Sequence, residues 1–169
     1  MNKYLLAVLL SLLFASSAVA ALKLNETAPT ISLRDLQGKY FYLGDYAGAK
    51  KIERGNGVIL SFFASWCTGC RNELPLVNSL VAELAGKGIK VVIVDVKEDA
   101  DTIGAFLAEL KVEKPVVLMD PTGEASDKYQ VRFLPTTFFI RADGRVKDII
   151  FGEIKDKDEL MASAGKLLK

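Results

Sequence analysis

The chain of 169 residues contains two cysteines, Cys67 and Cys70, which are separated by two residues. Two thiols at this spacing in the first turn of a helix lie on the same side of it, with Cα atoms roughly 5 to 6 Å apart, which is within the range that a disulfide accepts. The loop-entropy relation gives so short a ring roughly 2 kcal/mol of stabilisation, against about 3 kcal/mol for a fifteen-residue loop. A disulfide here is therefore a weak staple, and the pair favours reversible thiol-disulfide exchange.

The composition excludes several other kinds of chemistry. The chain has no histidine, so it lacks the usual general base and the commonest metal ligand. One Cys-x-x-Cys pair supplies only two of the four ligands that a closed zinc site needs, and we expect neither a metal nor another cofactor. With 22 basic and 21 acidic side chains, no basic surface is expected to attract nucleic acid.

The cysteines lie where a predicted strand passes into a predicted helix. Residues 58–64 form an apolar run in which Ser61 is the only polar side chain, and such a run is typical of a strand buried on both faces. After the cysteines, apolar side chains recur at steps of three and four residues, which predicts an amphipathic helix that ends at Gly86.

The position of each cysteine on this helix predicts its role. Cys67 lies at the helix N-terminus, where unpaired N–H groups and the helix dipole favour a thiolate, and the thiolate is the attacking species. Cys70, one turn further in and less exposed, would resolve the mixed disulfide and release the partner in reduced form. Glu73 is three residues further along the same face. Its carboxylate would either act on the cysteines, by handling the proton of Cys70 or by tuning both thiols through its charge, or only favour the helix N-terminus.

The rest of the chain predicts strands that alternate with helices. A hairpin comes first and an exposed loop follows at residues 50–57. Asp101 is predicted to cap a second helix, an Asp-Gly pair at residues 143–144 predicts a tight turn between two strands, and Asp156 with Glu159 forms the capping box of a last helix. The expected strands are 31–33, 40–43, 58–64, 89–95, 115–119, 136–141 and 146–151, with a short helix at 124–131. The three middle strands should be parallel.

The first twenty residues have the pattern of a secretory signal peptide. Lys3 precedes an apolar run at residues 4–14, and small residues lead to the Ala-Val-Ala sequence at 18–20, which is typical of a cleavage site. The alternative is an uncleaved membrane anchor, because residues 4–22 approach the length that spans a bilayer. Residues 21–169 are then expected to be one domain in the periplasm or at the extracytoplasmic face of the cell membrane, where a disulfide can persist.

The motifs SFFASWCTGC and RNELP, with the distant FLPTTFFI and ADGRV, resemble the thioredoxin superfamily, in particular TlpA/ResA-like extracytoplasmic thiol-disulfide oxidoreductases. The resemblance implies an α/β thioredoxin-like fold, with a central mixed sheet, helices on both faces, an N-terminal β-hairpin and a helix-bearing insert at residues 97–113. It also implies that Pro135 follows a cis bond beside the cysteines and exposes the backbone of Leu134 to a substrate. Trp66 matches the family tryptophan of the docking surface. A trans proline that opens a strand, and a tryptophan packed in the core, are the alternatives.

The same resemblance assigns Glu73 to an active-site glutamate of the ResA-like branch. Two departures from related proteins matter. Ser61 stands where cytoplasmic thioredoxins carry a buried aspartate, so Glu73 is the expected substitute in proton transfer. The dipeptide Thr68-Gly69 lacks the histidine of strong oxidases such as DsbA, and losing a cation that would stabilise the thiolate favours a reductant.

The first functional hypothesis is therefore a monomeric reductase that acts on oxidised exported proteins, with an apocytochrome c as one candidate substrate and a membrane electron donor for its own reduction. A disulfide oxidase or isomerase is the second. A peroxiredoxin-type thiol peroxidase is the third, but it needs a threonine shortly before its cysteine, and position 63 is phenylalanine. A copper-binding module is disfavoured because the chain has no histidine.

Overall fold

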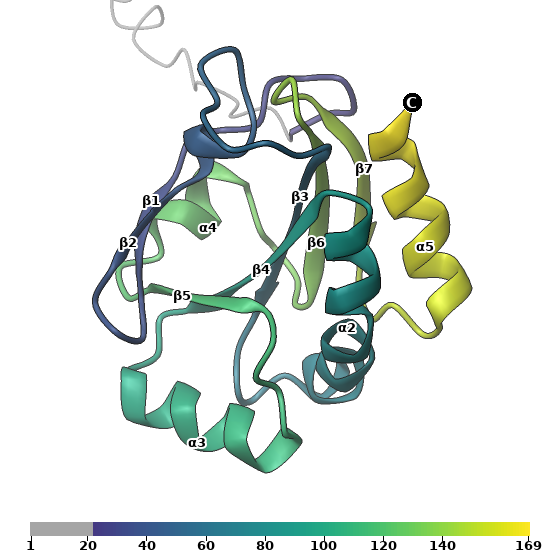
Figure 1. Ribbon diagram of the computed structural model, residues 1–169. Helices are drawn as coiled ribbons and strands as arrows, with labels where there is room; N and C mark the ends of the chain where they lie inside the picture. The colour runs from purple at the N-terminus through teal and green to yellow at the C-terminus, as the bar shows by residue number, and fades with distance from the viewer. Residues whose placement is uncertain (1–21) are drawn as a thin grey trace, which may run out of the picture.

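The centre of the molecule is a single mixed sheet (Figure 1), seen in a computed structural model that describes residues 22–169. Its seven strands lie in the order β2-β1-β5-β4-β3-β6-β7. As predicted, β3, β4 and β5 are parallel, while β6 runs antiparallel to both β3 and β7. The strands span Ser32–Asp35 (β1), Tyr40–Tyr42 (β2), Gly57–Phe63 (β3), Ile89–Val96 (β4), Val116–Asp120 (β5), Thr136–Arg141 (β6) and Val146–Phe151 (β7).

In residues 22–169, four α-helices join or follow these strands. They span Thr68–Gly86 (α2), Ala100–Leu110 (α3), Glu124–Lys128 (α4) and Lys157–Gly165 (α5), and short 3-10 turns occupy Leu43–Asp45 (η1) and Lys166–Leu168 (η2). Within residues 22–169, no helix has the length and apolar character needed to cross a bilayer.

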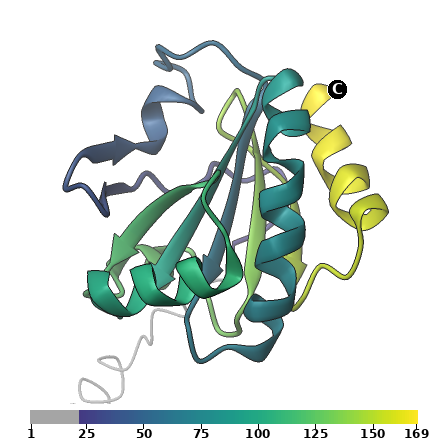
Figure 2. The ribbon, with the colours of Figure 1, turned by 60° about the horizontal axis from the view of Figure 1, so that its bottom comes forward.

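The side chains of β3 show how the helices are divided between two faces of the sheet. Successive residues of a strand point to opposite faces, and every residue of β3 is buried. Phe62 packs in a cluster with Tyr129, which directly follows α4. Ile59 packs in a second cluster with residues of α2 and α5, and Phe63 packs in a third with residues of α2 and α3. One face of the sheet therefore carries α2, α3 and α5 and the other carries α4 (Figure 1, Figure 2).

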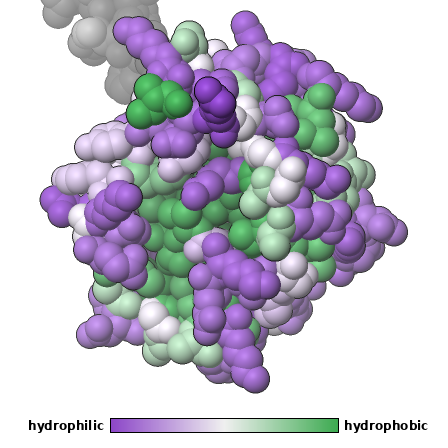
Figure 3. Space-filling model, in the orientation of Figure 1, coloured by the Kyte–Doolittle hydropathy of each residue, from purple (hydrophilic) through white to green (hydrophobic). Residues whose placement is uncertain are grey.

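The face that carries α2 and α3 is not uniformly covered. Figure 3 shows hydrophobic side chains at the bottom of a hollow near the middle of this face, with hydrophilic side chains around it. Leu36, Val117 and Met119 are only partly buried and pack against the cluster that contains both cysteines.

The predicted hairpin, the parallel strands and the helix-bearing insert are confirmed, while one cap was predicted wrongly. Asp99, and not Asp101, is the N-cap of α3, and its side chain accepts a hydrogen bond from the Thr102 N–H (2.8 Å). Asp101 lies inside the first turn because the helix begins at Ala100. The capping residue Asp156 is confirmed, since it accepts from the N–H three residues later (2.9 Å). The predicted signal peptide lies outside the described residues.

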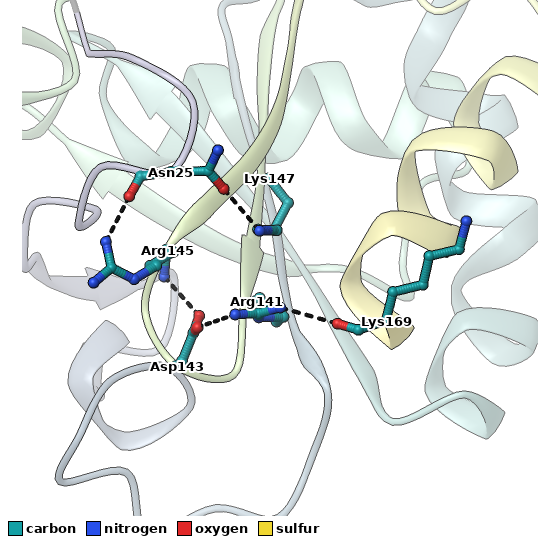
Figure 4. Close-up of polar contacts among 6 residues, drawn as sticks. All are labelled: Asn25, Arg141, Asp143, Arg145, Lys147 and Lys169. Carbon is teal, nitrogen blue, oxygen red and sulfur yellow. Dashed lines mark hydrogen bonds and ion pairs between the residues drawn. The ribbon is translucent and has the colours of Figure 1, made fainter.

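Polar contacts around the β6–β7 turn hold the end of the sheet that is away from the cysteines (Figure 4). Arg141 donates to the carbonyl of Lys169 (2.9 Å) and forms an ion pair with Asp143. Arg145 donates to the carbonyl of Asn25 (2.7 Å). Both ends of the described chain are thereby anchored to this hairpin. The cysteine pair lies at the opposite end of the strands, after the last residue of β3.

Candidate active site

The two cysteines lie at the junction of β3 and α2, as predicted, and they form a disulfide with Cα atoms 5.3 Å apart. Cys67 is the N-cap residue of α2, and its Sγ accepts a hydrogen bond from the Cys70 N–H (3.1 Å). Cys67 is 6% exposed, whereas Cys70 is 0% exposed. An approaching partner therefore reaches Cys67 first, which fits Cys67 as the nucleophile and Cys70 as the resolving thiol.

The loop before β6 closes over the cysteine-bearing turn. The Leu134–Pro135 peptide bond is cis, as the resemblance implied. A Cβ atom added to Gly69, between the cysteines, would lie 3.2 Å from Pro135 Cδ. Leu134 is half-buried and packs against the cluster that contains both cysteines. The structure therefore brings Leu134 and Pro135 to the site from far along the chain.

Large aromatic side chains on the segments that meet at the site are exposed. Trp66 is 72% exposed, so the alternative in which it packs in the core is wrong. Phe133, two residues before the cis proline, is 70% exposed, and Phe151, which pairs with Thr136 at the start of β6, is 66% exposed. Exposed apolar surface of this kind commonly marks a protein interaction site. Sequence reasoning identified Trp66 but missed both phenylalanines. The available signal was a large apolar side chain just before Pro135 and another at the end of a predicted strand.

Glu73, three residues after Cys70 on α2, is buried, with 1% of its surface exposed. Its Oε2 accepts a hydrogen bond from the Ile154 N–H (2.8 Å), and its Oε1 accepts from the Ser61 hydroxyl (3.1 Å). The Thr137 hydroxyl donates to Ser61 Oγ (2.8 Å). Burial raises the pKa of Glu73 to about 7, because it disfavours the charged form more than these hydrogen bonds favour it, and the charge of Glu153 adds to the rise.

These contacts argue against one of the two roles considered for Glu73, the one in which its carboxylate only favours the helix N-terminus. Its hydrogen-bond partners belong to β3, β6 and the segment after β7, and not to the first turn of α2. A carboxylate with these partners does not serve mainly to stabilise the N–H groups and the dipole at the start of α2. Side chains three residues apart on a helix have Cβ atoms about 5 to 6 Å apart, so Glu73 is a neighbour of Cys70. A carboxyl group whose pKa lies near neutrality is suited to proton transfer there.

Sequence reasoning missed Glu98, which lies between β4 and α3. Its Oε2 accepts a hydrogen bond from the Ser65 N–H and its Oε1 accepts from the Ser65 hydroxyl, both at 2.6 Å. Ser65 belongs to the segment that leads from β3 to Cys67, so Glu98 fixes that segment. The signal was present in the order of the strands: parallel neighbours end at the same edge of a sheet, and Phe63 of β3 pairs with Asp95 of β4.

Glu153, in the segment between β7 and α5, is a second acid that sequence reasoning missed. Its Oε2 accepts a hydrogen bond from Asn72 Nδ2 (3.2 Å) and lies 3.6 Å from the position of a Cβ atom on Gly69. A carboxylate therefore flanks the dipeptide between the cysteines. Nothing in the spacing of the sequence places this residue at the site.

Comparisons with known proteins agree with this geometry. Residues 24–149 match the AhpC/TSA family. The chain is 34% identical over 138 residues to Thiol-disulfide oxidoreductase ResA of Geobacillus thermodenitrificans, covering 82% of this chain and 75% of that protein. It is 33% identical over 132 residues to the protein of the same name from Bacillus subtilis, covering 78% and 69%. A solved structure of a putative thiol:disulfide interchange protein DsbE from Chlorobium tepidum superposes with a TM-score of 0.72 and 30% identity, over 86% of this chain and 100% of that one.

The family match spans residues 24–149, and these relatives are named for the chemistry that the cysteine pair predicts. A peroxidoxin from Mycobacterium tuberculosis superposes with a TM-score of 0.70 at 22% identity, which reflects the shared fold alone. The chain belongs to the AhpC/TSA family of thioredoxin-like proteins and is a thiol-disulfide oxidoreductase.

Proposed function

We propose that the protein works as a reductant of disulfides in exported polypeptides. The observation that carries this direction is the presence of carboxyl groups around the cysteine pair: Glu73 is buried one helical turn after Cys70, and Glu153 flanks Gly69. Nearby negative charge disfavours a thiolate. Strong oxidants of this fold owe their potential to a stabilised reduced form. A pair surrounded by acids, in a chain without histidine, lacks that stabilisation and gives up its electrons more readily.

The reaction proceeds by two exchanges of sulfur bonds. The Cys67 thiolate attacks one sulfur of the partner disulfide, a Cys67–partner bond forms, and the other partner sulfur leaves as a thiolate that takes up a proton. Cys70 then loses its proton and attacks Cys67 Sγ, so that the Cys67–partner bond breaks as the Cys67–Cys70 disulfide forms, and the second partner sulfur leaves as a thiolate that takes up a proton. Two electrons pass from the protein to the partner, and a second dithiol donor must return them.

Glu73 is proposed to receive the proton of Cys70 in the second exchange. With a pKa of about 7, its carboxyl group is ionised in a large fraction of molecules at neutral pH and can accept a proton. The Ser61 and Ile154 hydrogen bonds keep the carboxylate in one orientation during the transfer.

The substrate is proposed to be an extended segment of an oxidised exported protein, docked beside Pro135 and the exposed ring of Trp66. The signal-like first twenty residues support an extracytoplasmic location, and a membrane protein that carries a dithiol is the class of donor that would return electrons there. An apocytochrome c belongs to the substrate class, since it presents a Cys-x-x-Cys pair. The protein is proposed to act as a monomer.

One observation favours the alternative of a disulfide oxidase or isomerase. Cys67 is an N-cap residue whose Sγ accepts the Cys70 N–H, and such an environment stabilises a thiolate and raises the reduction potential. The protein is therefore an oxidant if the helix N-terminus has the larger effect on the stability of the thiolate, and a reductant if the surrounding acids have the larger effect.

Equilibration of the purified protein with a series of dithiol and disulfide buffers separates the two. We expect a potential near that of thioredoxin, about −270 mV, whereas a value above about −180 mV would assign the protein to the oxidases. Reduction of insulin disulfides with a dithiol as electron source gives the activity readout, and Cys67→Ser should abolish it. Insulin reduction that survives in the Cys67→Ser protein would exclude the proposed chemistry.

A further inference from the structure

Two carboxyl groups, those of Asp95 and Glu98, lie next to the segment that leads to Cys67. Asp95, the penultimate residue of β4, is 0% exposed. Its Oδ1 accepts a hydrogen bond from the Glu98 N–H (3.0 Å). Its Oδ2 is buried, and no donor in the described part of the chain reaches it. An ionised carboxylate in this position would leave one buried oxygen without a partner, which is costly.

A proton on Asp95 resolves this conflict, because the protonated carboxyl group becomes a donor. The acceptor beside it is the Glu98 carboxylate, which two hydrogen bonds from Ser65 keep ionised. The pKa of each of these carboxyl groups is shifted by the other, and two carboxyl groups coupled in this way share one proton, since neighbouring like charges disfavour joint ionisation.

The charges that face Asp95 act in the same direction. The pKa of Asp95 is raised to about 8, first by burial and then by the hydrogen bond to Glu98, the charge of Glu98 and the charge of Asp120 on β5, against the opposing hydrogen bond from the Glu98 N–H. Burial opposes the ionisation of Glu98, but hydrogen bonds from Ser65 and Asp95 outweigh it and lower the pKa of Glu98 despite the nearby charge of Asp99.

We propose that Asp95 is a positioning residue for thiol-disulfide exchange, because it donates its proton to a hydrogen bond with Glu98, which in turn holds Ser65 and the Trp66–Cys67 segment. The chain of contacts runs from the end of β4 to the residue that attacks. Its effect on exchange rests on the proposed function, whereas its effect on the shape of the segment does not. When Asp95 ionises, the repulsion between the two carboxylates loosens the hold on Ser65.

The oxidised protein offers a direct test, because its bonded cysteines do not titrate and Trp66 is the only tryptophan. The emission of Trp66 is followed from about pH 5 to about pH 9, with excitation selective for tryptophan. We expect one transition near pH 8, the pKa of Asp95. In Asp95→Asn the amide donates to Glu98 as the protonated acid does, so the transition should disappear and the low-pH emission should persist. Glu73→Gln is the matched control and should retain the transition.

A transition that survives in Asp95→Asn, or that disappears only in Glu73→Gln, would overturn the proposal, as would wild-type emission that does not change over this range. Glu98→Gln tests the pair from the other side if Asp95→Asn does not fold. Removing the neighbouring charge should move the transition to lower pH, and an unchanged midpoint would refute the pairing.

Exchange between the reduced protein and a small neutral disulfide at neutral pH gives the functional readout. Asp95→Ala, which removes the donor, should slow the reaction about tenfold, the equivalent of about 1.4 kcal/mol, whereas Asp95→Asn should restore the rate to within about twofold of wild type. Equal loss in both variants would mean that Asp95 only supports the fold. A wild-type protein that reduces no disulfide would instead refute the proposed function, and the fluorescence result would still stand.

Discussion

Replacing Glu73 by glutamine should make the oxidised protein more stable at alkaline pH and leave its stability in acid nearly unchanged. Glutamine has almost the same shape as a protonated glutamic acid. Its carbonyl can accept the Ile154 N–H, and its amide can donate to the Ser61 hydroxyl, so both contacts of the wild-type side chain are retained. What the substitution removes is the charge that a buried carboxylate acquires as the pH rises.

The size of the effect follows from the pKa of Glu73, which burial raises from its ordinary value of 4.5 to about 7. Since the folded protein holds this proton more tightly than the unfolded chain, the group's contribution to stability is fully present below about pH 4.5 and is lost as the pH rises through 7. Each pH unit between the two pKa values is worth about 1.4 kcal/mol, so the loss amounts to roughly 3 kcal/mol. Glu73→Gln should not show this loss.

Urea denaturation of the oxidised wild type and the variant, at several values from about pH 4 to about pH 9, measures the difference. The disulfide must stay intact, so that no thiol titrates. Asp95, whose pKa is also raised by burial, lowers the stability of both proteins alike over this range and cancels in the comparison. The free energy of unfolding of the variant should exceed that of wild type by roughly 3 kcal/mol at pH 8 and by little at pH 4.

A difference that does not change with pH would refute this account of Glu73. A variant that is less stable at every pH would show that Glu73 is ionised throughout and that its hydrogen bonds to Ser61 and Ile154, and not its burial, determine its state.

Two further substitutions test the surroundings of Glu73. Ser61→Ala removes a hydrogen bond that favours the ionised form, so the pKa of Glu73 should rise by up to about one pH unit, as read from the same denaturation series; a fall in that pKa would contradict the assigned contact. Glu153→Gln removes a like charge, so the pKa of Glu73 should fall. The same loss of negative charge should stabilise the thiolate, so the reduction potential of the cysteine pair in the Glu153→Gln protein should rise by about 20 mV, the equivalent of about 1 kcal/mol for a two-electron couple. An unchanged or lower potential would show that Glu153 does not favour the reducing direction.

The parts of the site that follow from local sequence were predictable. The strand before Cys67 is predicted by a continuous apolar run and the helix after it by apolar residues at steps of three and four. Both patterns depend on residues that are close in the sequence. The cis bond at Pro135 came from the resemblance to a family and is present. The cap of α3 was assigned to the wrong aspartate because Asp99 and Asp101 both suit a helix start, and only the backbone decides which of them precedes the first turn.

The contacts that tune the site depend on tertiary packing. Glu98 meets Ser65 only because β3 and β4 lie side by side and end at the same edge, with Phe63 opposite Asp95. Glu153 reaches Gly69 because the segment after β7 passes over the start of α2. No local pattern encodes these approaches. The burial that raises the pKa of a carboxyl group likewise depends on the residues that pack around it.

The central claim is that Cys67 attacks and Cys70 resolves, and trapping of the intermediate tests it most directly. The reduced Cys70→Ser and Cys67→Ser proteins are mixed with an oxidised polypeptide substrate, quenched with a thiol-blocking reagent and separated without reductant. Cys70→Ser should accumulate a covalent adduct through Cys67 that a dithiol releases, and Cys67→Ser should form little or none. An adduct that accumulates only through Cys70, in the Cys67→Ser protein, would contradict the assignment.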